Sequence, residues 1–397
     1  MCMLPFDVPS DVSNPQSAPQ SAAESVRLSP TVYATEPAAP AEQGEPEKPD
    51  IPLSVLDVAP VGTGYTATQA LRTTAELARR AERWGYHRFW VAEHHNMPGI
   101  ASTSPPVLLA HLAAHTTTLR LGSGGVMLPN HAPLVVAEQF GTLQALAPGR
   151  IDIGLGRAPG TDQATMRALR RSAQQSGPDD FPQQLGELLG FLSGSFQEGH
   201  PYGHINAVPG PANGIAGGGE WDASRPPVWL LGSSGYSAQL AGILGLPFAF
   251  AHHFSAANTI PALRLYREHF QPSEDLKEPY AMIAAGVIAA DTEEEARRLA
   301  LAQALAMMRL RGGRPGLLPS PEEAENHPWT PAEREFVRAY QGDHVIGDPA
   351  TVRRGLFELA ARTEVDELMV ICNVHGDEAR LRSYEIVARE WGLPGAV

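Results

Sequence analysis

Cysteine is almost absent from this chain of 397 residues, and lysine is nearly as scarce. The only cysteines are Cys2 and Cys372, at opposite ends of the sequence. This pair excludes a disulfide framework, a Cys-x-x-Cys redox motif, a zinc ribbon and an iron–sulfur cluster. The only lysines, Lys48 and Lys277, stand in polar segments flanked by proline. We therefore expect neither a P-loop nor a Schiff-base lysine in a pocket.

Basic charge and long apolar runs are also lacking. The chain has 30 Lys and Arg against 44 Asp and Glu, a formal charge of −14. This balance argues against a protein that holds nucleic acid or a polybasic membrane contact. No apolar run reaches the roughly 18 residues that span a bilayer, and the start of the chain lacks the basic end and apolar core of a secretory signal. We expect a cytoplasmic protein without nucleic-acid or membrane partners.

What is present is the composition of a globular protein, with 43% hydrophobic and 19% charged residues. Residues 1–50 differ from the rest, because they hold eight acids against two bases among many Pro, Ser and Ala. Such a segment buries too little apolar surface to offset its ordering entropy. The sequence therefore predicts a disordered acidic tail over residues 1–50 and one folded domain over residues 51–397.

Short apolar runs alternate with amphipathic stretches throughout this domain. The runs predict strands at Leu53–Ala59, Arg88–Glu93, Leu119–Leu128, Ile151–Leu155, Pro227–Leu231, Pro247–Ala251, Tyr280–Ala290 and Asp366–Asn373. The stretches predict helices, among them Ala67–Trp84, Pro105–Thr116, Leu134–Leu146, Tyr236–Leu244, Thr292–Arg311 and Pro349–Ala361. Strands that are apolar throughout are typical of a parallel sheet covered by helices. The pattern predicts an α/β fold, a single (β/α)8 TIM barrel.

Two connections in the predicted barrel exceed the usual roughly 2–6 residues. They follow strands 4 and 7 and span about residues 158–225 and 311–345. Long loops after barrel strands are either substrate loops and lids or solvated excursions. The sequence leaves both readings open.

Catalytic groups of a barrel lie at the carboxyl ends of its strands. After strand 5, Gly232-Ser233-Ser234-Gly235 leads into a helix near Tyr236, so free backbone N–H groups and two hydroxyls converge at a helix N-terminus. Arg157, at the end of strand 4, could add a guanidinium. This arrangement favours a phosphate, although a serine-capped helix beside a surface arginine has the same sequence.

Histidines and acids at other strand ends allow acid–base or metal chemistry. Glu93-His94-His95 follows strand 2, Asp57 ends strand 1, and His253 follows strand 6. A metal-dependent hydrolase would gather Asp57, His94 and His253. Against it, strand 1 has no His-x-His motif and strands 5 to 8 lack a set of glutamates. We therefore expect no metal and keep the hydrolase as the lesser alternative.

Several segments, in order along the chain, resemble the bacterial luciferase-like flavin monooxygenases. They are Trp90-Val-Ala-Glu-His-His-Asn96, Arg120-Leu-Gly-Ser-Gly-Gly-Val-Met-Leu-Pro-Asn-His-Ala-Pro133, Pro148-Gly-Arg-Ile-Asp-Ile-Gly-Leu-Gly-Arg157, Leu231-Gly-Ser-Ser-Gly-Tyr-Ser237 and Gly347-Asp-Pro349…Val365-Asp-Glu-Leu-Met-Val370. The resemblance covers about residues 53–390. It implies a barrel that binds reduced FMN, which reacts with dioxygen to oxidise a small organic substrate.

The resemblance also implies roles for individual residues. Those expected to bind the cofactor are Gly124, Gly125, Arg157, Gly232, Ser233, Ser234, Gly235 and Tyr236. Gly124-Gly125 would lie against the flavin ring, where the family often has a non-prolyl cis peptide. His94 matches the family's active-site histidine, whose imidazole suits proton transfer. Asp57, Glu93, His95 and His253 are expected at the substrate or just behind these groups.

Three further expectations concern partners and alternatives. A separate reductase would supply the reduced flavin, because the sequence shows no second nucleotide-binding fold. Relatives are commonly homodimers, and the apolar helix Pro105–Thr116 could form such an interface. The same barrel also hosts deazaflavin-dependent hydride-transfer enzymes and non-catalytic flavin-binding proteins. The phosphate-loop motifs do not separate these, and the substrate is not readable from them.

Overall fold

A computed structural model describes residues 46–169, 180–213 and 225–396. The chain divides into a unit of residues 1–44 and a unit of residues 45–397, and all described residues belong to the second. The predicted acidic tail therefore lies, up to residue 45, outside the described residues.

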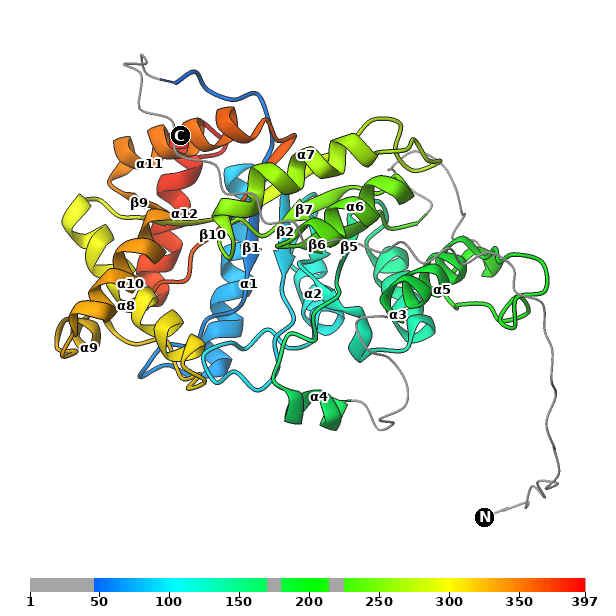
Figure 1. Ribbon diagram of the computed structural model, residues 1–397, viewed down its shortest axis with the longest axis horizontal. Coiled ribbons are helices and arrows are strands. Elements are labelled where there is room, and N and C mark those ends of the chain that lie inside the picture. Colours follow the sequence, from blue (N-terminus) through cyan, green and yellow to red (C-terminus); the bar gives the residue numbers. More distant parts are fainter. Residues whose placement is uncertain (1–45, 170–179, 214–224, 397) are drawn as a thin grey trace. The chain divides into compact units, whose positions relative to one another are not determined.

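Eight parallel strands of the described part form a closed ring (Figure 1). They are β1 (Leu53–Asp57), β2 (Arg88–Val91), β3 (Arg120–Ser123), β5 (Ile151–Gly156), β6 (Val228–Gly232), β7 (Phe248–Phe250), β8 (Ala281–Ala289) and β10 (Glu367–Ile371). The ring closes because β10 pairs with both β1 and β8. Two shorter strands, β4 (Val126–Met127) and β9 (Val345–Gly347), pair with β5 and β8. The predicted (β/α)8 barrel is confirmed.

The strands are buried on both faces, which explains their continuous apolar runs. All nine residues of β8 are buried. Successive side chains alternate between the barrel interior and the surrounding helices. In β2, Phe89 belongs to the core beneath the helices, whereas Trp90 belongs to the separate cluster inside the barrel. The interior cluster also contains Trp229, whose ring meets that of Trp90 edge-on with centroids 5.2 Å apart.

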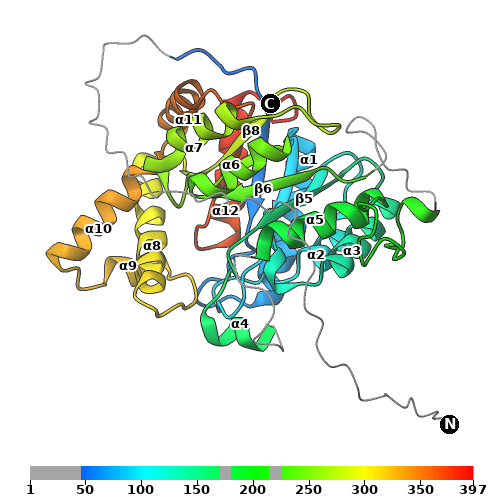
Figure 2. The same ribbon diagram turned by 45° about the vertical axis from the view of Figure 1, so that its right-hand side comes forward.

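Helices surround the ring (Figure 2), and several of them begin at capping residues. Those outside the two long connections are α1 (Ala67–Trp84), α2 (Pro105–Ala113), α3 (Pro133–Leu146), α6 (Gly235–Leu244), α7 (Thr259–His269), α8 (Glu293–Arg311), α11 (Pro349–Thr363) and α12 (Asp377–Trp391). In α1, Thr66 and Gln69 form a capping box, and Gly85 ends the helix in the left-handed conformation. Three glutamates in the first turn of α8 and two arginines in its last turn complement the helix dipole.

Both long connections contain helices. The first has α4 (Gln163–Leu169) and α5 (Phe181–Ser193), and α5 packs against α3 through buried Phe181, Leu185 and Leu188. The second has α9 (Pro321–Glu325) and α10 (Pro331–Gly342), which pack against α8. Figures 1 and 2 both show α8, α9 and α10 gathered on one side of the barrel and α3 with α5 on another. No helix in the described ranges is long and apolar enough to cross a bilayer.

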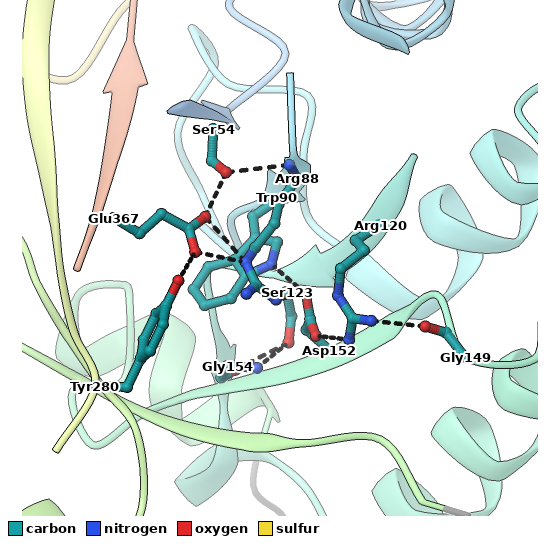
Figure 3. Close-up of polar contacts among 10 residues, drawn as sticks. All are labelled: Ser54, Arg88, Trp90, Arg120, Ser123, Gly149, Asp152, Gly154, Tyr280 and Glu367. Atoms are coloured by element: carbon teal, nitrogen blue, oxygen red, sulfur yellow. Dashed lines mark hydrogen bonds and ion pairs between the residues drawn. The ribbon is translucent and has the colours of Figure 1, made fainter. Parts of the chain in front are cut away.

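A layer of charged side chains closes the amino end of the barrel (Figure 3). Arg88 donates from Nε to Glu367 and from Nη1 to Asp152, each at 2.9 Å. Arg120 also binds Asp152, and Tyr280 donates to Glu367 at 3.0 Å. Burial raises the pKa of Asp152, but Arg88 and Arg120 outweigh this effect and hold the pKa below its usual value. Asp152 therefore stays charged beneath the interior tryptophans, between Arg88 and Arg120.

Candidate active site

A cavity of about 460 Å³ lies at the carboxyl ends of the strands. Its volume falls within the roughly 300–1,000 Å³ of small-molecule sites. Trp90 lies at its base, and residues following β2, β5, β6, β7 and β10 form its walls. The cavity brings together eight of the residues singled out from the sequence: His94, Gly124, Gly125, Arg157, Gly232, Ser233, Ser234 and His253.

One end of the cavity is suited to an anion. Ser234 is the N-cap of α6 but makes no side-chain cap, so the first-turn N–H groups of this ten-residue helix are left without that partner. The Arg157 guanidinium lies 4.2 Å from the centre of the Tyr236 ring, in cation–π geometry. Gly235 and Tyr236 do not line the cavity themselves. Tyr236 instead supports Arg157 from behind, beside a helix end with positive character.

The glycine pair forms a flat stretch of wall. The Gly124–Gly125 peptide bond is cis, and it lies between the two strands β3 and β4. The strand predicted over Leu119–Leu128 exists in two parts, since β3 ends at Ser123 and β4 begins at Val126. Side chains do not fit here: a Cβ on Gly124 would lie 2.6 Å from Leu56 Cδ1, and one on Gly125 would lie 2.7 Å from the Gly154 carbonyl oxygen. Glycine thus lets this backbone lie directly on the cavity.

His94 lines the cavity beyond the glycine pair. Its backbone N–H donates to the Ser102 carbonyl at 3.1 Å. Its Nδ1 is buried and has no hydrogen-bond partner. Burial lowers the pKa of His94 to about 4, so the ring is neutral at pH 7. A neutral imidazole with an unpaired buried nitrogen has hydrogen-bonding capacity left for a ligand.

Two more neutral histidines line the same cavity. His253 Nδ1 lies 2.8 Å from the Ala284 carbonyl oxygen, which can only accept, so Nδ1 carries the proton and Nε2 is an acceptor. Burial lowers the pKa of His253 to about 4. His344 Nδ1 lies 2.8 Å from the Tyr340 carbonyl, and burial likewise lowers the pKa of His344. These rings add polarity to the cavity without adding charge at neutral pH.

Glu93 is buried behind the cavity and does not hydrogen-bond to His94. Its carboxylate accepts from the Met127 N–H at 3.0 Å, and the Nε2 atoms of His95 and His131 lie 2.8 and 2.9 Å from it. Burial raises the pKa of Glu93, but His131, His95 and Met127 outweigh that effect and lower it overall. Glu93 therefore fixes the loop after the glycine pair, and His95 lies outside the cavity.

Asp57 also lies outside the cavity. It is buried between the barrel and its helices, where it accepts from Arg380 of α12 and from Thr74 of α1 at 2.6 Å. Asp57, His94 and His253 are therefore not gathered into one cluster. Within residues 46–169, 180–213 and 225–396, no group of three His, Cys, Asp or Glu is placed to hold a metal ion.

The cavity includes residues that the sequence patterns did not single out. They are Gln303, Met307 and Leu310 of α8, Tyr340 of α10, and His344 before β9. Asn373, the last residue of the predicted strand Asp366–Asn373, also lines the cavity. The others belong to α8, to α10 or to the segment between α10 and β9, whose position over the barrel mouth depends on tertiary packing. Tyr340 and His344 of the second long connection line the cavity.

The chain matches known proteins along most of its length. The sequence model of the family described as luciferase-like monooxygenase matches residues 51–367. A luciferase-like monooxygenase of Escherichia coli (strain K12) is 49% identical over 336 residues, 85% of this chain and 96% of that protein. An N-acetyl-S-alkylcysteine monooxygenase of Bacillus subtilis (strain 168) is 34% identical over 340 residues, 85% of this chain and 97% of that protein.

Solved structures share the fold. The crystal structure of apo-MsnO8 is 37% identical, covers 86% of this chain and 99% of its own, and has a TM-score of 0.76. The oxygenating constituent of 3,6-diketocamphane monooxygenase from Pseudomonas putida, in complex with FMN, has a TM-score of 0.61 at 19% identity over 87% of this chain and 98% of its own. An F420-dependent secondary alcohol dehydrogenase has a TM-score of 0.59 at 13% identity over 87% and 99%.

Proposed function

This chain belongs to the luciferase-like monooxygenase family, and we propose that it is an FMN-dependent monooxygenase of small organic substrates. The observation that carries the proposal is the pairing of two unlike ends in one cavity. The end at Arg157 and the α6 N-terminus suits a phosphate, and the end at the glycine pair and His94 suits a planar ring.

The residues present fit a flavin mononucleotide. Ser233, Ser234 and the first N–H groups of α6 would hold its phosphate together with Arg157. Gly124 and Gly125 leave a side-chain-free wall for the ring, because a Cβ at either position would collide with the barrel. The unpaired His94 Nδ1 gives a hydrogen-bonding group beside that wall. The cavity thus has groups suited to the phosphate and groups suited to the ring of the cofactor.

Reduced flavin would supply the two electrons for splitting dioxygen, with one oxygen atom entering the substrate and the other leaving as water. The protein has to exclude water, orient the ring and move protons. Trp90 and the aliphatic barrel interior close the cavity from below. His94, neutral at pH 7, would exchange a proton with the reacting molecules through its buried ring. Protonation of His94 at low pH would remove this acceptor.

The charge of the cavity favours FMN over a deazaflavin with an extended anionic tail. Among the described residues that line the cavity, Arg157 is the only permanently charged one. A longer anionic tail would need further cations at the mouth. Arg170 and Arg171 lie outside the described residues. FMN needs no more than the phosphate site at Arg157.

We further propose that a separate reductase supplies the reduced flavin and that the enzyme is a homodimer. The described residues form one barrel without a second nucleotide-binding fold. Val107 of α2 and Leu146 of α3 are 70% and 69% exposed, on neighbouring helices. Burying such side chains against a second copy would be favourable. Light scattering should give a dimer mass for the purified chain, and Val107→Asp should shift it toward the monomer.

A spectral titration followed by an oxygen pulse tests the proposed function. The protein is mixed with FMN and, separately, with the deazaflavin F420, then reduced without oxygen and exposed to it with a panel of substrates. We expect micromolar or tighter FMN binding, weaker F420 binding, and substrate-dependent product containing oxygen from labelled dioxygen.

Other results would point elsewhere. Preference for F420 without reaction with dioxygen would indicate a hydride-transfer enzyme and contradict the proposal. Flavin binding with no product from the panel would favour a flavin carrier. His94→Asn separates the roles, because it should abolish turnover while FMN still binds.

A further inference from the structure

A smaller cavity of about 110 Å³ adjoins the large one on the side of α8 and α10. We call it the side chamber and define it by the residues that line both cavities, chiefly Ile100, Gln303, Met307, Leu310, Tyr340 and Asn373. Gln303, Met307 and Leu310 are spaced by four and three residues on α8, so they share one helix face. The chamber lies away from Arg157, which does not line it.

Three neutral polar groups of the side chamber have unused hydrogen-bonding capacity. Gln303 and Tyr340 are 7% and 8% exposed, and their side chains hydrogen-bond to no other residue in the described ranges. Asn373 Oδ1 is buried without a partner. Buried polar groups are normally paired, since leaving one unpaired is destabilising. Two amides and a phenol therefore remain available to a ligand.

The rest of the side chamber is apolar and carries no formal charge. No Asp, Glu, Lys or Arg is found among the described residues that line it. His94, His253 and His344 lie along the adjoining cavity, and burial lowers the pKa of each. An anionic group entering here would lose its hydration without gaining a cation.

From this we infer that the side chamber binds an uncharged organic substrate with an apolar body and one carbonyl or similar acceptor, held by Gln303 and Tyr340. The Gln303 amide N–H and the Tyr340 phenol would donate to that acceptor, whereas Asn373 Oδ1 could only accept. Met307, Leu310 and Ile100 would pack on the body. Substrates bearing a carboxylate or sulfonate at this end would be rejected. The inference rests on the proposed function, in which the flavin takes the Arg157 end of the large cavity.

Three probes of nearly equal shape test the inference without turnover. Acetophenone has a neutral carbonyl, benzoate replaces its methyl group by a charged oxygen, and cumene replaces its carbonyl oxygen by a methyl group. Affinities are measured by calorimetry on the FMN-loaded protein, where the phosphate occupies Arg157. A second series uses Arg157→Ala without flavin, so that benzoate has no guanidinium to bind in either series.

We expect acetophenone to bind at least about 10-fold more tightly than benzoate, because the chamber offers no cation. Acetophenone should bind about 3- to 10-fold more tightly than cumene, the size of a neutral hydrogen bond. Gln303→Leu should bring the acetophenone affinity close to that of cumene and leave cumene unchanged. Gln183→Leu, on the exposed face of α5, is the matched control and should change neither.

Benzoate binding as tightly as acetophenone, or no binding by any of the three probes, would overturn the inference. So would a Gln303→Leu variant that loses acetophenone and cumene equally, since this would indicate a general packing defect. Failure of FMN to bind would instead count against the proposed function. The flavin-free Arg157→Ala series still ranks the probes in that case, so the two failures are distinguishable.

Discussion

The contribution of Arg157 to cofactor binding can be isolated by comparing FMN with riboflavin, which has the same ring but no phosphate. Arg157 would make a charge-assisted hydrogen bond to the phosphate, a contact of about 1.5–3 kcal/mol. Arg157→Ala should therefore raise the FMN dissociation constant by about 10- to 150-fold. The dissociation constant of riboflavin should change by less than about 2-fold, because Arg157 has no partner on it.

The packing of Arg157 on Tyr236 refines this prediction. The 4.2 Å cation–π contact holds the guanidinium in place, and such contacts contribute about 0.5–1 kcal/mol at partly exposed sites. Tyr236→Leu should therefore weaken FMN by about 2- to 5-fold. Arg157→Lys keeps the charge but loses the planar fork and the stacking, so its affinity should lie between wild type and Arg157→Ala.

Quenching of flavin fluorescence on binding measures all these affinities, with circular dichroism to confirm that each variant is folded. Equal losses of FMN and riboflavin would refute the reasoning, because they would mean that the substitution disturbs the ring site. Unchanged FMN affinity in Arg157→Ala would place the phosphate elsewhere.

Three further predictions concern stability and are checked by urea unfolding. Gly125→Ala should destabilise the fold by about 1–3 kcal/mol, because the added Cβ would meet the Gly154 carbonyl oxygen. The control Gly186→Ala in α5, where an added Cβ has no atom within 4 Å, should be neutral or stabilising. Equal losses of stability in the two variants would contradict this account. Burial lowers the pKa of His252 to about 4, so the unfolded chain binds the proton first as pH falls, and His252 alone should contribute a loss of about 2 kcal/mol between pH 7 and 5, in addition to the losses from His94 and His253. His252→Asn should make that part of the pH profile less steep by this amount, and an unchanged slope would be evidence against the burial effect. Asp57→Asn should cost about 3–5 kcal/mol, because it leaves Arg380 buried without its anion; a loss below 1 kcal/mol would show that the pair matters little.

The barrel and one end of the site could be predicted because their signals are local. Hydrophobic periodicity predicts apolar strands such as Ile151–Leu155. Together with capping residues, it also predicts the helix Ala67–Trp84, whose observed bounds are the same. The Gly232–Ser234 loop lies at the cavity because loops that connect a strand to the next helix lie at the carboxyl-terminal face of a barrel. The order of the strands and the positions of the loops between them were enough to predict these elements from the sequence.

Other features depend on contacts that no local pattern encodes. The strand expected over Leu119–Leu128 is interrupted at the glycine pair, where a Cβ would collide with Leu56 or with the Gly154 carbonyl oxygen. Asp57 ends a barrel strand, as a catalytic acid would, yet its side chain points outward to Arg380, which is 323 residues away. Gln303 looked like one polar residue of an amphipathic helix, and only the packing of α8 over the mouth brings it to the cavity.

The charged layer at the amino end of the barrel is complete only when the last barrel strand is in place. Arg88, Arg120 and Asp152 are all made in the first half of the chain, but Glu367 emerges only near its end. Until then this layer has two cations and one anion, an excess charge that opposes burial in a closed barrel. The arrival of β10 neutralises the layer and closes the ring in the same step. A chain cut short before Glu367 thus lacks both the last barrel strand and the charge that balances the interior of the barrel.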